Sequence, residues 1–286
     1  MTFTEHAAIF PCVGDQLLGI VAAPELPQAT GVLIVVGGPQ YRVGSHRQFL
    51  LLSRALAEAG YPAMRFDFRG MGDSTGELRD FEEVNEDIGA AINAFQAHCP
   101  QLERIVLWGL CDAASASLLY WDTTRDARIG GLVLLNPWVR SEATLARAYV
   151  KHYYGQRLVQ PEFWRKLLTG RLDIGRALGG FIGSLRQARQ QDPSTKKERV
   201  MSFQQRMLRG LQEFPGVSTI ILSGNDYTAK EFLESANASV AWQEILKQEN
   251  VSMTEILAAD HTFSSAEWRS GVERLTIGWM KQVSGR

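Results

Sequence analysis

Short apolar runs rich in β-branched and aromatic residues alternate along most of this chain with longer segments whose apolar residues recur every three or four positions. The first pattern is typical of strands buried on both faces, and the second of amphipathic helices. Repeated strand–helix alternation requires parallel strands joined by crossover helices. We therefore predict an α/β fold with a mostly parallel central sheet and helices on both faces. After an N-terminal hairpin, the predicted strands are 31–38, 61–68, 104–110, 130–138, 216–226 and 251–258, and the predicted helices include 47–58, 81–97, 112–121 and 266–282.

The alternation stops between residues 140 and 210, where helical patches rich in Arg and aromatic residues replace the β-branched runs. This segment holds 15 Lys and Arg against 5 Asp and Glu, a net charge of +10, whereas the rest of the chain holds 15 against 26, or −11. We predict an α/β core of residues 1–139 and 211–286, with residues 140–210 inserted as a helical cap. The basic cap indicates an anionic ligand, and an acidic sugar, a phosphopantetheine-type acyl carrier and a peripheral contact with a membrane surface remain open.

Composition excludes several classes of function. The 286 residues are 45% apolar, which is enough for a large core, and their net charge of −1 argues against a nucleic-acid-binding protein. No apolar run reaches the length of a membrane-spanning helix, and the first residues lack the pattern of a signal peptide. The three cysteines, Cys12, Cys99 and Cys111, are too few and too widely spaced for a zinc site or a disulfide scaffold. We expect a cytoplasmic protein with no metal and no cofactor.

The most specific local motif joins the strand 104–110 to the following helix. It reads Gly109-Leu110-Cys111-Asp112-Ala113, the pattern of a nucleophile elbow with Cys in place of Ser and Ala in place of the second Gly. Such a turn is tight enough that the residues two positions either side of the nucleophile must be Gly or nearly as small. The helix N-terminus behind the turn stabilises a thiolate and the oxyanion formed during acyl transfer. Cys111 is therefore the candidate nucleophile, against the alternative of a buried structural thiol.

The order of residues along the chain supports this interpretation, because a triad on such a fold follows the order nucleophile, acid, histidine. Asp226 lies just after the apolar run VSTIIL, at the carboxyl end of the predicted strand 216–226, and His261 lies in the loop after the last strand. Asp226 is the candidate acid that orients His261, and His261 is the candidate base. Asp260, directly beside the histidine, is the main rival for the role of the acid.

An acyl-transfer site also needs an oxyanion hole. One donor is expected to be the backbone N–H of Asp112, and the other an N–H of the loop that follows the strand 31–38. Pro39 in this loop has no N–H, so Gln40 is the better candidate, and Gly38 lets the backbone approach a substrate closely. The glycine-rich stretch 66–74 lacks the Gly spacing and the Lys of a phosphate-binding loop and is interpreted as structural. The substrate-binding candidates are Gly38, Tyr41, Trp138, Tyr153 and Trp164.

With these residues identified, the chain resembles the α/β-hydrolase superfamily over nearly its whole length. Within it, the stretches GGPQYRVGSHRQF, WGLCDAASA and LVLLNPWVR resemble the exosortase-A-system-associated hydrolases, bacterial proteins encoded near exopolysaccharide and protein-sorting machinery. The resemblance implies a hydrolase fold with a cysteine nucleophile and a link to exopolysaccharide production. It does not imply a particular substrate.

These observations predict hydrolysis of an ester, thioester or lactone through a covalent acyl-enzyme on Cys111. Acyl transfer to an acceptor other than water remains open, because a thiol leaves more easily than an alkoxide. A non-catalytic scaffold whose cap binds a partner is the other alternative. A binding module has no need of a Cys, an Asp and a His at these three positions, which favours catalysis.

Overall fold

The computed structural model describes residues 2–38, 40–140 and 201–284. Within them, eight strands form one sheet in the order β1-β2-β4-β3-β5-β6-β7-β8. The six strands β3 to β8 run parallel to one another, and the β1–β2 hairpin continues the sheet by antiparallel pairing of β2 with β4. The α/β fold expected from the sequence is therefore confirmed. The strands are β1 Phe3–Cys12, β2 Asp15–Pro24, β3 Thr30–Val35, β4 Ala63–Phe66, β5 Arg104–Leu110, β6 Ile129–Leu135, β7 Val217–Ser223 and β8 Val251–Ile256.

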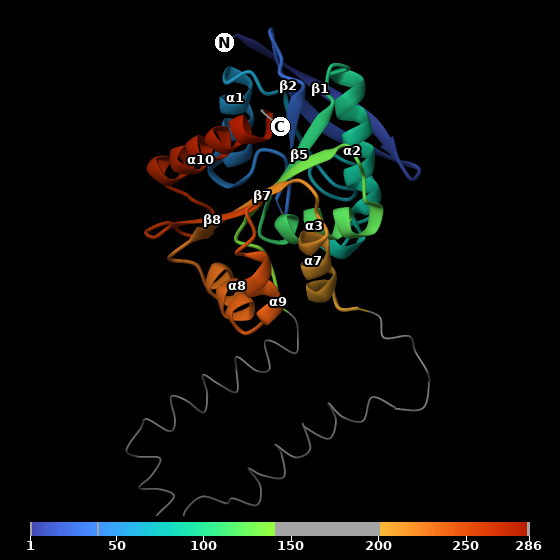
Figure 1. The fold of residues 1–286 in the computed structure, drawn as a ribbon. Coiled ribbons are helices and arrows are strands. Elements are labelled where there is room, and N and C mark those ends of the chain that lie inside the picture. Colours follow the sequence, from blue (N-terminus) through green and yellow to red (C-terminus); the bar gives the residue numbers. More distant parts are fainter. Residues whose placement is uncertain (1, 39, 141–200, 285–286) are drawn as a thin grey trace, which may run out of the picture. The chain divides into compact units, whose positions relative to one another are not determined.

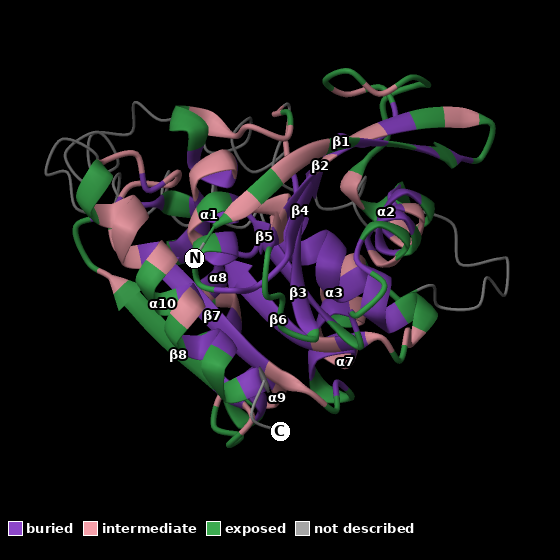
Figure 2. Ribbon diagram, turned by 90° about the horizontal axis from the view of Figure 1, so that it is seen from above, coloured by how far each residue is buried: buried purple, intermediate pink, exposed green. Residues whose placement is uncertain are grey.

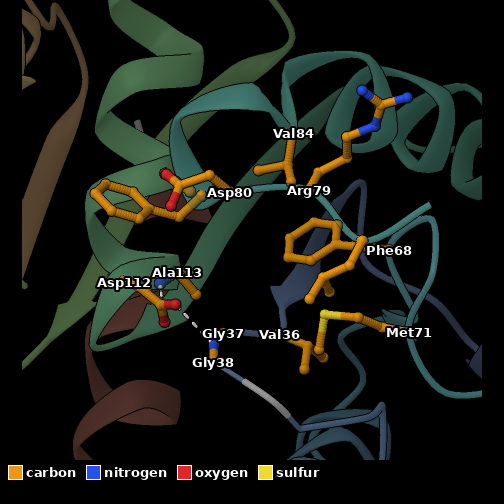
Figure 3. Close-up of a pocket in the computed structure, with 13 residues that line it drawn as sticks. Val36, Gly37, Gly38, Phe68, Met71, Arg79, Asp80, Val84, Asp112 and Ala113 are labelled. Atoms are coloured by element: carbon orange, nitrogen blue, oxygen red, sulfur yellow. Dashed lines mark hydrogen bonds between the residues drawn. The ribbon is translucent and has the colours of Figure 1, made fainter.

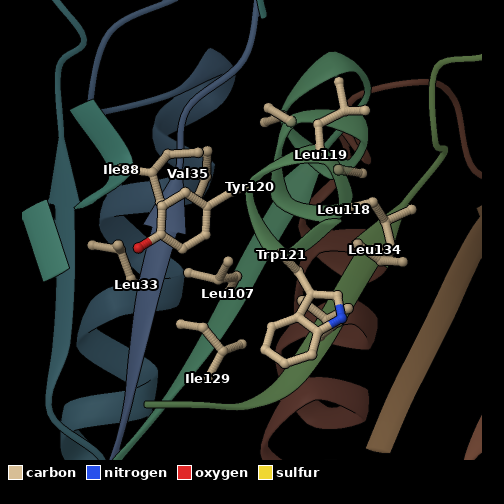
Figure 4. Close-up of a cluster of buried hydrophobic side chains, with 14 of the residues drawn as sticks. Leu33, Val35, Ile88, Leu107, Leu118, Leu119, Tyr120, Trp121, Ile129 and Leu134 are labelled. Atoms are coloured by element: carbon tan, nitrogen blue, oxygen red, sulfur yellow. The ribbon is translucent and has the colours of Figure 1, made fainter. Parts of the chain in front are cut away.

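Helices cover both faces of the sheet (Figure 1). On one face, α1 and α10 pack over β3, β5 and β6 through an apolar cluster that includes Phe49, Trp108 and Trp279. On the other face, α2, α3, α7 and α9 contribute to a larger cluster, in which Leu118 and Leu119 of α3 meet Leu107 and Leu134 of the sheet (Figure 4). The helices are α1 Gln48–Glu58, α2 Asn85–His98, α3 Asp112–Thr124, α7 Phe203–Gln212, α8 Tyr227–Asn237, α9 Val240–Ile245 and α10 Ala266–Ser284, with short 3-10 turns η1 Ser45–Arg47 and η2 Phe81–Glu83.

Burial follows the position of a strand in the sheet. Every residue of β3 is buried, as is all of β5 except Arg104, whereas four consecutive residues of the edge strand β8 are exposed (Figure 2). The central strands are covered by helices on both faces, and this explains why their sequences read as continuous apolar runs. The carboxyl ends of these central strands are the place where loops from several strands converge, and in open α/β sheets this edge carries the functional groups.

Contacts divide the chain into two units, residues 1–139 with 202–286 and residues 140–201. Helix α7 spans the predicted boundary at residue 210 and belongs to the first unit. Ser202 begins the helix with a capping box, and Arg209 pairs with the buried Asp122 of α3 at 2.7 Å. Residues 141–200 of the expected cap lie outside the described residues.

Candidate active site

The turn between β5 and α3 holds Cys111 in a rare backbone conformation. Its φ of 63° and ψ of −124° lie in a region that residues with a side chain seldom occupy, so the turn stores strain. Backbone hydrogen bonds hold it there. The Cys111 N–H donates to the Leu135 carbonyl of β6 at 2.8 Å, and the Cys111 carbonyl accepts from Ala114 at 3.1 Å and from Trp138 at 3.3 Å. The side chain of Cys111 is half-buried and forms no disulfide.

Small neighbours are a physical requirement of this turn. A Cβ atom on Gly109 would lie 2.5 Å from the Ala113 carbonyl oxygen, so no larger residue fits at that position. Ala113 is buried, and its methyl group is accommodated where the usual pattern has a second glycine. The tight turn expected at this motif is therefore present, with Cys111 at its apex.

The histidine and one aspartate of the expected triad lie in contact. His261 Nδ1 lies 2.9 Å from Asp226 Oδ2. The hydrogen bond to Asp226, followed by a hydrogen bond with the Cys111 side chain, raises the pKa of His261 to about 10. With Nδ1 occupied by Asp226, the other ring nitrogen is left for Cys111. The fold thus brings together three residues that are 35 to 150 positions apart in sequence.

Asp226 also begins helix α8. Its two carboxylate oxygens accept the backbone N–H groups of Thr228 at 3.2 Å and Ala229 at 3.1 Å. Burial raises the pKa of Asp226, but the hydrogen bonds from His261 and from these N–H groups outweigh burial, so the net pKa is below its usual value. The rival Asp260 instead accepts the backbone N–H of Ser264 at 2.9 Å and binds its hydroxyl group.

Sequence reasoning missed Asn136, which lies at the end of β6 and is fully buried. Its side-chain nitrogen donates to the Ser223 hydroxyl at 2.8 Å and to the His261 carbonyl at 3.1 Å, and its oxygen accepts the Ser223 N–H at 2.8 Å. Asn136 therefore joins the ends of β6 and β7 to the histidine loop. A polar residue directly after a buried apolar strand was the signal available in the sequence.

The loop after β3 approaches the N-terminus of α3. The backbone N–H of Gly38, a residue with a φ of 60°, donates to Oδ2 of Asp112 at 2.8 Å. The side chain of Gln40, the other expected oxyanion residue, accepts the Ser45 N–H at 3.1 Å and so stabilises its own loop. Of the two expected donor residues, Asp112 directly follows Cys111 and Gln40 lies in the loop after β3. The Asp112 side chain contacts this loop directly.

A cavity of about 230 Å³ lies beside these two segments (Figure 3). Its walls are mostly apolar, and Asp112, Asp80 and Arg79 are its charged groups. The stretch 66–74 supplies part of the wall through Phe68 and Met71, and its Asp67 is buried against Arg42. The cavity is lined by Val36, Gly37, Gly38, Phe68, Met71, Leu78, Arg79, Asp80, Phe81, Val84, Asp112, Ala113 and Ala116.

The other substrate-binding candidates occupy different positions. Tyr41 is 47% exposed, and the Arg42 guanidinium lies over its ring at 5.7 Å from the centroid. The backbone of Trp138 is tied to the nucleophile turn, because its carbonyl accepts the Ser115 hydroxyl at 2.7 Å. Neither residue lines the cavity beside Asp112. Tyr153 and Trp164 lie outside the described residues.

The two remaining cysteines lie away from this arrangement. Cys12 ends β1 and Cys99 follows α2, and both are buried. Burial raises the pKa of the Cys99 thiol to about 11 and also raises that of Cys12, so both thiols are poor nucleophiles near neutral pH. In the part of the chain that the structure describes, no cluster of His, Cys, Asp and Glu could hold a metal ion, and no helix is both long and apolar enough to cross a membrane.

Solved structures with the same fold include several hydrolases. An esterase from Pyrococcus furiosus superposes with a TM-score of 0.65 at 16% identity, covering 98% of this chain and 91% of that protein. An esterase from Butyrivibrio proteoclasticus, solved with ferulic acid bound, gives a TM-score of 0.61 at 14% identity over 97% and 99% of the two chains. An α/β-hydrolase from a Penicillium species gives 0.61 at 16% identity over 98% of each chain. No curated protein matches the sequence.

These likenesses confirm the α/β-hydrolase fold. In this chain Cys111 follows β5, Asp226 follows β7 and His261 follows β8. A sequence profile of the family described as serine aminopeptidase, S33, matches residues 28–211, more than half of the chain and a range that contains the nucleophile turn. The chain therefore belongs to the serine aminopeptidase S33 family of α/β-hydrolases and is a hydrolase.

Proposed function

We propose that the protein hydrolyses an ester, thioester or lactone through a covalent thioester on Cys111, with His261 as the base and Asp226 as the residue that orients it. The proposal is carried by the strained turn at Cys111 together with a histidine whose Nδ1 is held by the Asp226 carboxylate and whose pKa Cys111 helps to raise. The esterases among the structural neighbours support an acyl substrate.

The reaction follows from this arrangement. His261 takes the Cys111 proton, and the sulfur forms a bond to the acyl carbon while the carbonyl electrons move to oxygen. Collapse of that intermediate expels the alkoxide or thiolate leaving group, which receives the proton from His261. Water, deprotonated by His261, then attacks the thioester, and its breakdown releases the acid and restores the Cys111 thiol. Backbone N–H groups of Asp112 and Gln40 are the proposed donors to the oxyanion in both halves.

A panel of acyl esters and acyl thioesters, assayed with the wild type and with Cys111→Ala, tests this function. Cys111→Ala is expected to lose at least about a thousandfold in kcat/KM, since the covalent path is removed. Cys12→Ala and Cys99→Ala are matched controls that remove a buried thiol, and turnover per folded molecule should stay within about twofold of the wild type. Full turnover by Cys111→Ala would show that another group carries the reaction.

Acyl transfer is the close alternative, favoured by the thioester intermediate, because a thioester reacts readily with nucleophiles other than water. Adding an alcohol, amine or thiol acceptor to the assay separates the two outcomes by product analysis. Transfer predicts acylated acceptor at the expense of free acid. A third alternative, a non-catalytic scaffold, predicts that no thiol-reactive acyl probe labels Cys111.

The charge of residues 140–210 supports an anionic acyl donor or carrier, with contact to a membrane surface as the other source of negative charge. At net +10, this segment should attract anions with an affinity that falls as salt rises. Binding of an anionic acyl donor measured from about 20 to 300 mM salt should weaken by about tenfold, whereas a neutral analogue should not respond. Equal salt dependence of the two ligands would show that electrostatic attraction does not contribute to binding.

We also place the enzyme in bacterial exopolysaccharide production associated with an exosortase system, on the resemblance of its three sequence stretches to that group of hydrolases. Three unpaired cysteines support a reducing compartment, the cytoplasm. A strain that lacks the protein should change its exopolysaccharide yield, and the wild type but not Cys111→Ala should restore it. Restoration by both the wild type and Cys111→Ala would show that the role in exopolysaccharide production does not need the proposed reaction at Cys111.

A further inference from the structure

The side chain of Asp112 binds backbone N–H groups of the kind that an acyl-transfer site needs as oxyanion donors. Its Oδ2 accepts the Gly38 N–H at 2.8 Å, and its Oδ1 accepts the Ala113 N–H at 3.0 Å. A single anion thus occupies the start of α3 and the loop after β3, directly beside Cys111. An oxyanion formed on Cys111 is expected to bind in this region.

The packing around the carboxylate shows that this position is built into the fold. A Cβ atom on Gly37 would lie 2.1 Å from Asp112 Oδ1, so the carboxylate fills the space that a side chain at residue 37 would need. No Lys or Arg among the described residues forms an ion pair with Asp112, whose hydrogen bonds all come from backbone N–H groups. The carboxylate is therefore held by the same kind of donors that would stabilise a substrate oxyanion.

The cavity of about 230 Å³ gives the side chain a place to move. Asp112 lines this cavity together with Phe68, Met71 and Val84, whose side chains surround the open space (Figure 3). Burial raises the pKa of Asp112, the Gly38 and Ala113 N–H groups lower it, and Asp80 raises it further, with a net increase. The carboxylate is thus less stable as an anion here than in water.

We propose that Asp112 is an internal competitor for the oxyanion site, which the substrate carbonyl oxygen must displace toward the adjacent cavity before Cys111 reacts. This inference rests on the proposed function for its catalytic meaning. The position of the carboxylate itself does not depend on that function. The Asp112 carboxylate acts as a gate because it blocks the backbone N–H donors. Only a substrate that binds strongly enough through its other contacts displaces the carboxylate.

The test measures Cys111 labelling by two small alkylating reagents, anionic iodoacetate and neutral iodoacetamide, followed by mass spectrometry of the Cys111 peptide. In each case the thiolate displaces iodide and forms a carbon–sulfur bond. Freeing the backbone donors should help the anionic reagent selectively. The ratio of the iodoacetate rate to the iodoacetamide rate should rise about tenfold in Asp112→Ala and about threefold in Asp112→Asn, which keeps the shape but loses the charge.

Asp80→Asn is the matched control. It removes a negative charge from the same cavity, but among the described residues the Asp80 carboxylate accepts the Glu82 N–H, at 3.1 Å, and no N–H of α3, so no donor of α3 is freed. Its ratio should change by less than about twofold. The thermal unfolding of every variant shows whether it folds, and Asp112→Asn keeps the test valid if Asp112→Ala does not.

The same variants are assayed for ester turnover, where Asp112→Ala should raise kcat/KM about tenfold for a small activated ester. An unchanged labelling ratio in both Asp112 variants, or a loss of turnover with an unchanged ratio, would overturn the gate. A raised ratio with no turnover by any protein would support the gate and reject the proposed hydrolase function. Absence of Cys111 labelling by either reagent in every protein would overturn both.

Discussion

Two aspartates at helix N-termini differ in their environments: Asp226 contacts His261, and Asp112 lies beside Cys111. Asp226 at the start of α8 binds two backbone N–H groups and His261, and its pKa falls. Asp112 at the start of α3 binds backbone N–H groups alone, beside Cys111, and its pKa rises. The two positions look alike in sequence, each following the end of a buried strand. The difference is that one carboxylate has an imidazole partner and the other faces an apolar cavity.

The comparison implies opposite consequences for catalysis. Removing the charge of Asp226 deprives His261 of its orienting partner, whereas removing the charge of Asp112 opens donors beside Cys111. The predictions below test the two sides separately, beginning with the largest effect.

Asp226→Asn should lower kcat by about 10⁴-fold, because an amide at this position favours the wrong tautomer of His261. Steady-state kinetics on the best ester or thioester measures the loss. Asp260→Asn is the matched control in the neighbouring loop and should retain at least about a third of the wild-type kcat. Equal losses in the two variants would mean that the acid has been assigned to the wrong residue.

Asn136→Ala should remove the link between the His261 loop and the ends of β6 and β7. Three buried hydrogen bonds are lost, so we expect a destabilisation of about 2–4 kcal/mol, measured by urea unfolding. The kcat should fall about a hundredfold, with KM changing less than about threefold, because the residue positions the base without contacting substrate. Asn237→Ala on the exposed end of α8 should change stability by less than about 0.5 kcal/mol. A wild-type kcat in folded Asn136→Ala would deny it a positioning role.

Gly37→Ala tests the Asp112 side of the comparison. The added methyl group would overlap the Asp112 carboxylate and press on Ala113, so we expect a destabilisation of about 2–3 kcal/mol. Repeating the substitution in an Asp112→Ala background should recover about 1 kcal/mol, since one of the two clashes is gone. Chemical denaturation of the four proteins in this cycle gives the coupling. Strict additivity would show that the carboxylate does not occupy the space over Gly37.

The pH dependence of stability tests the Asp226 side of the comparison, and its expected effect is the smallest. The raised pKa of His261 contributes stability that is fully present below its unfolded pKa near 6.5 and is lost as pH rises through about 10. The stability gap between the wild type and Asp226→Asn should therefore be about 1 kcal/mol larger at pH 6 than at pH 10, a modest value because the imidazole is 35% exposed. Urea unfolding at the two pH values measures the gap. A gap that widens toward pH 10 would contradict the assigned direction.

Much of this arrangement could be read from local patterns. The strand 104–110 agrees with β5, and the expected start of α3 at Asp112 agrees with its observed start, because a buried run followed by small residues leaves few alternatives. The expected N-terminal hairpin is present, and the pairing of Cys12 with Asp15 makes Val13-Gly14 its two-residue loop. Register depends on pairing with the opposite strand, and hydrophobic pattern alone leaves it uncertain by a residue.

The sequence by itself determined the α/β class and the order in which Cys111, Asp226 and His261 follow their strands, because the periods of buried strands and amphipathic helices are local properties of the chain. Only the tertiary structure decided that Asp226 and not Asp260 contacts His261, that Asn136 joins the ends of two strands to the histidine loop, and that the Asp112 carboxylate lies against Gly37 and Gly38. These contacts depend on which strands are neighbours in the sheet and on the direction in which each side chain leaves its turn, and distances along the chain do not encode either one.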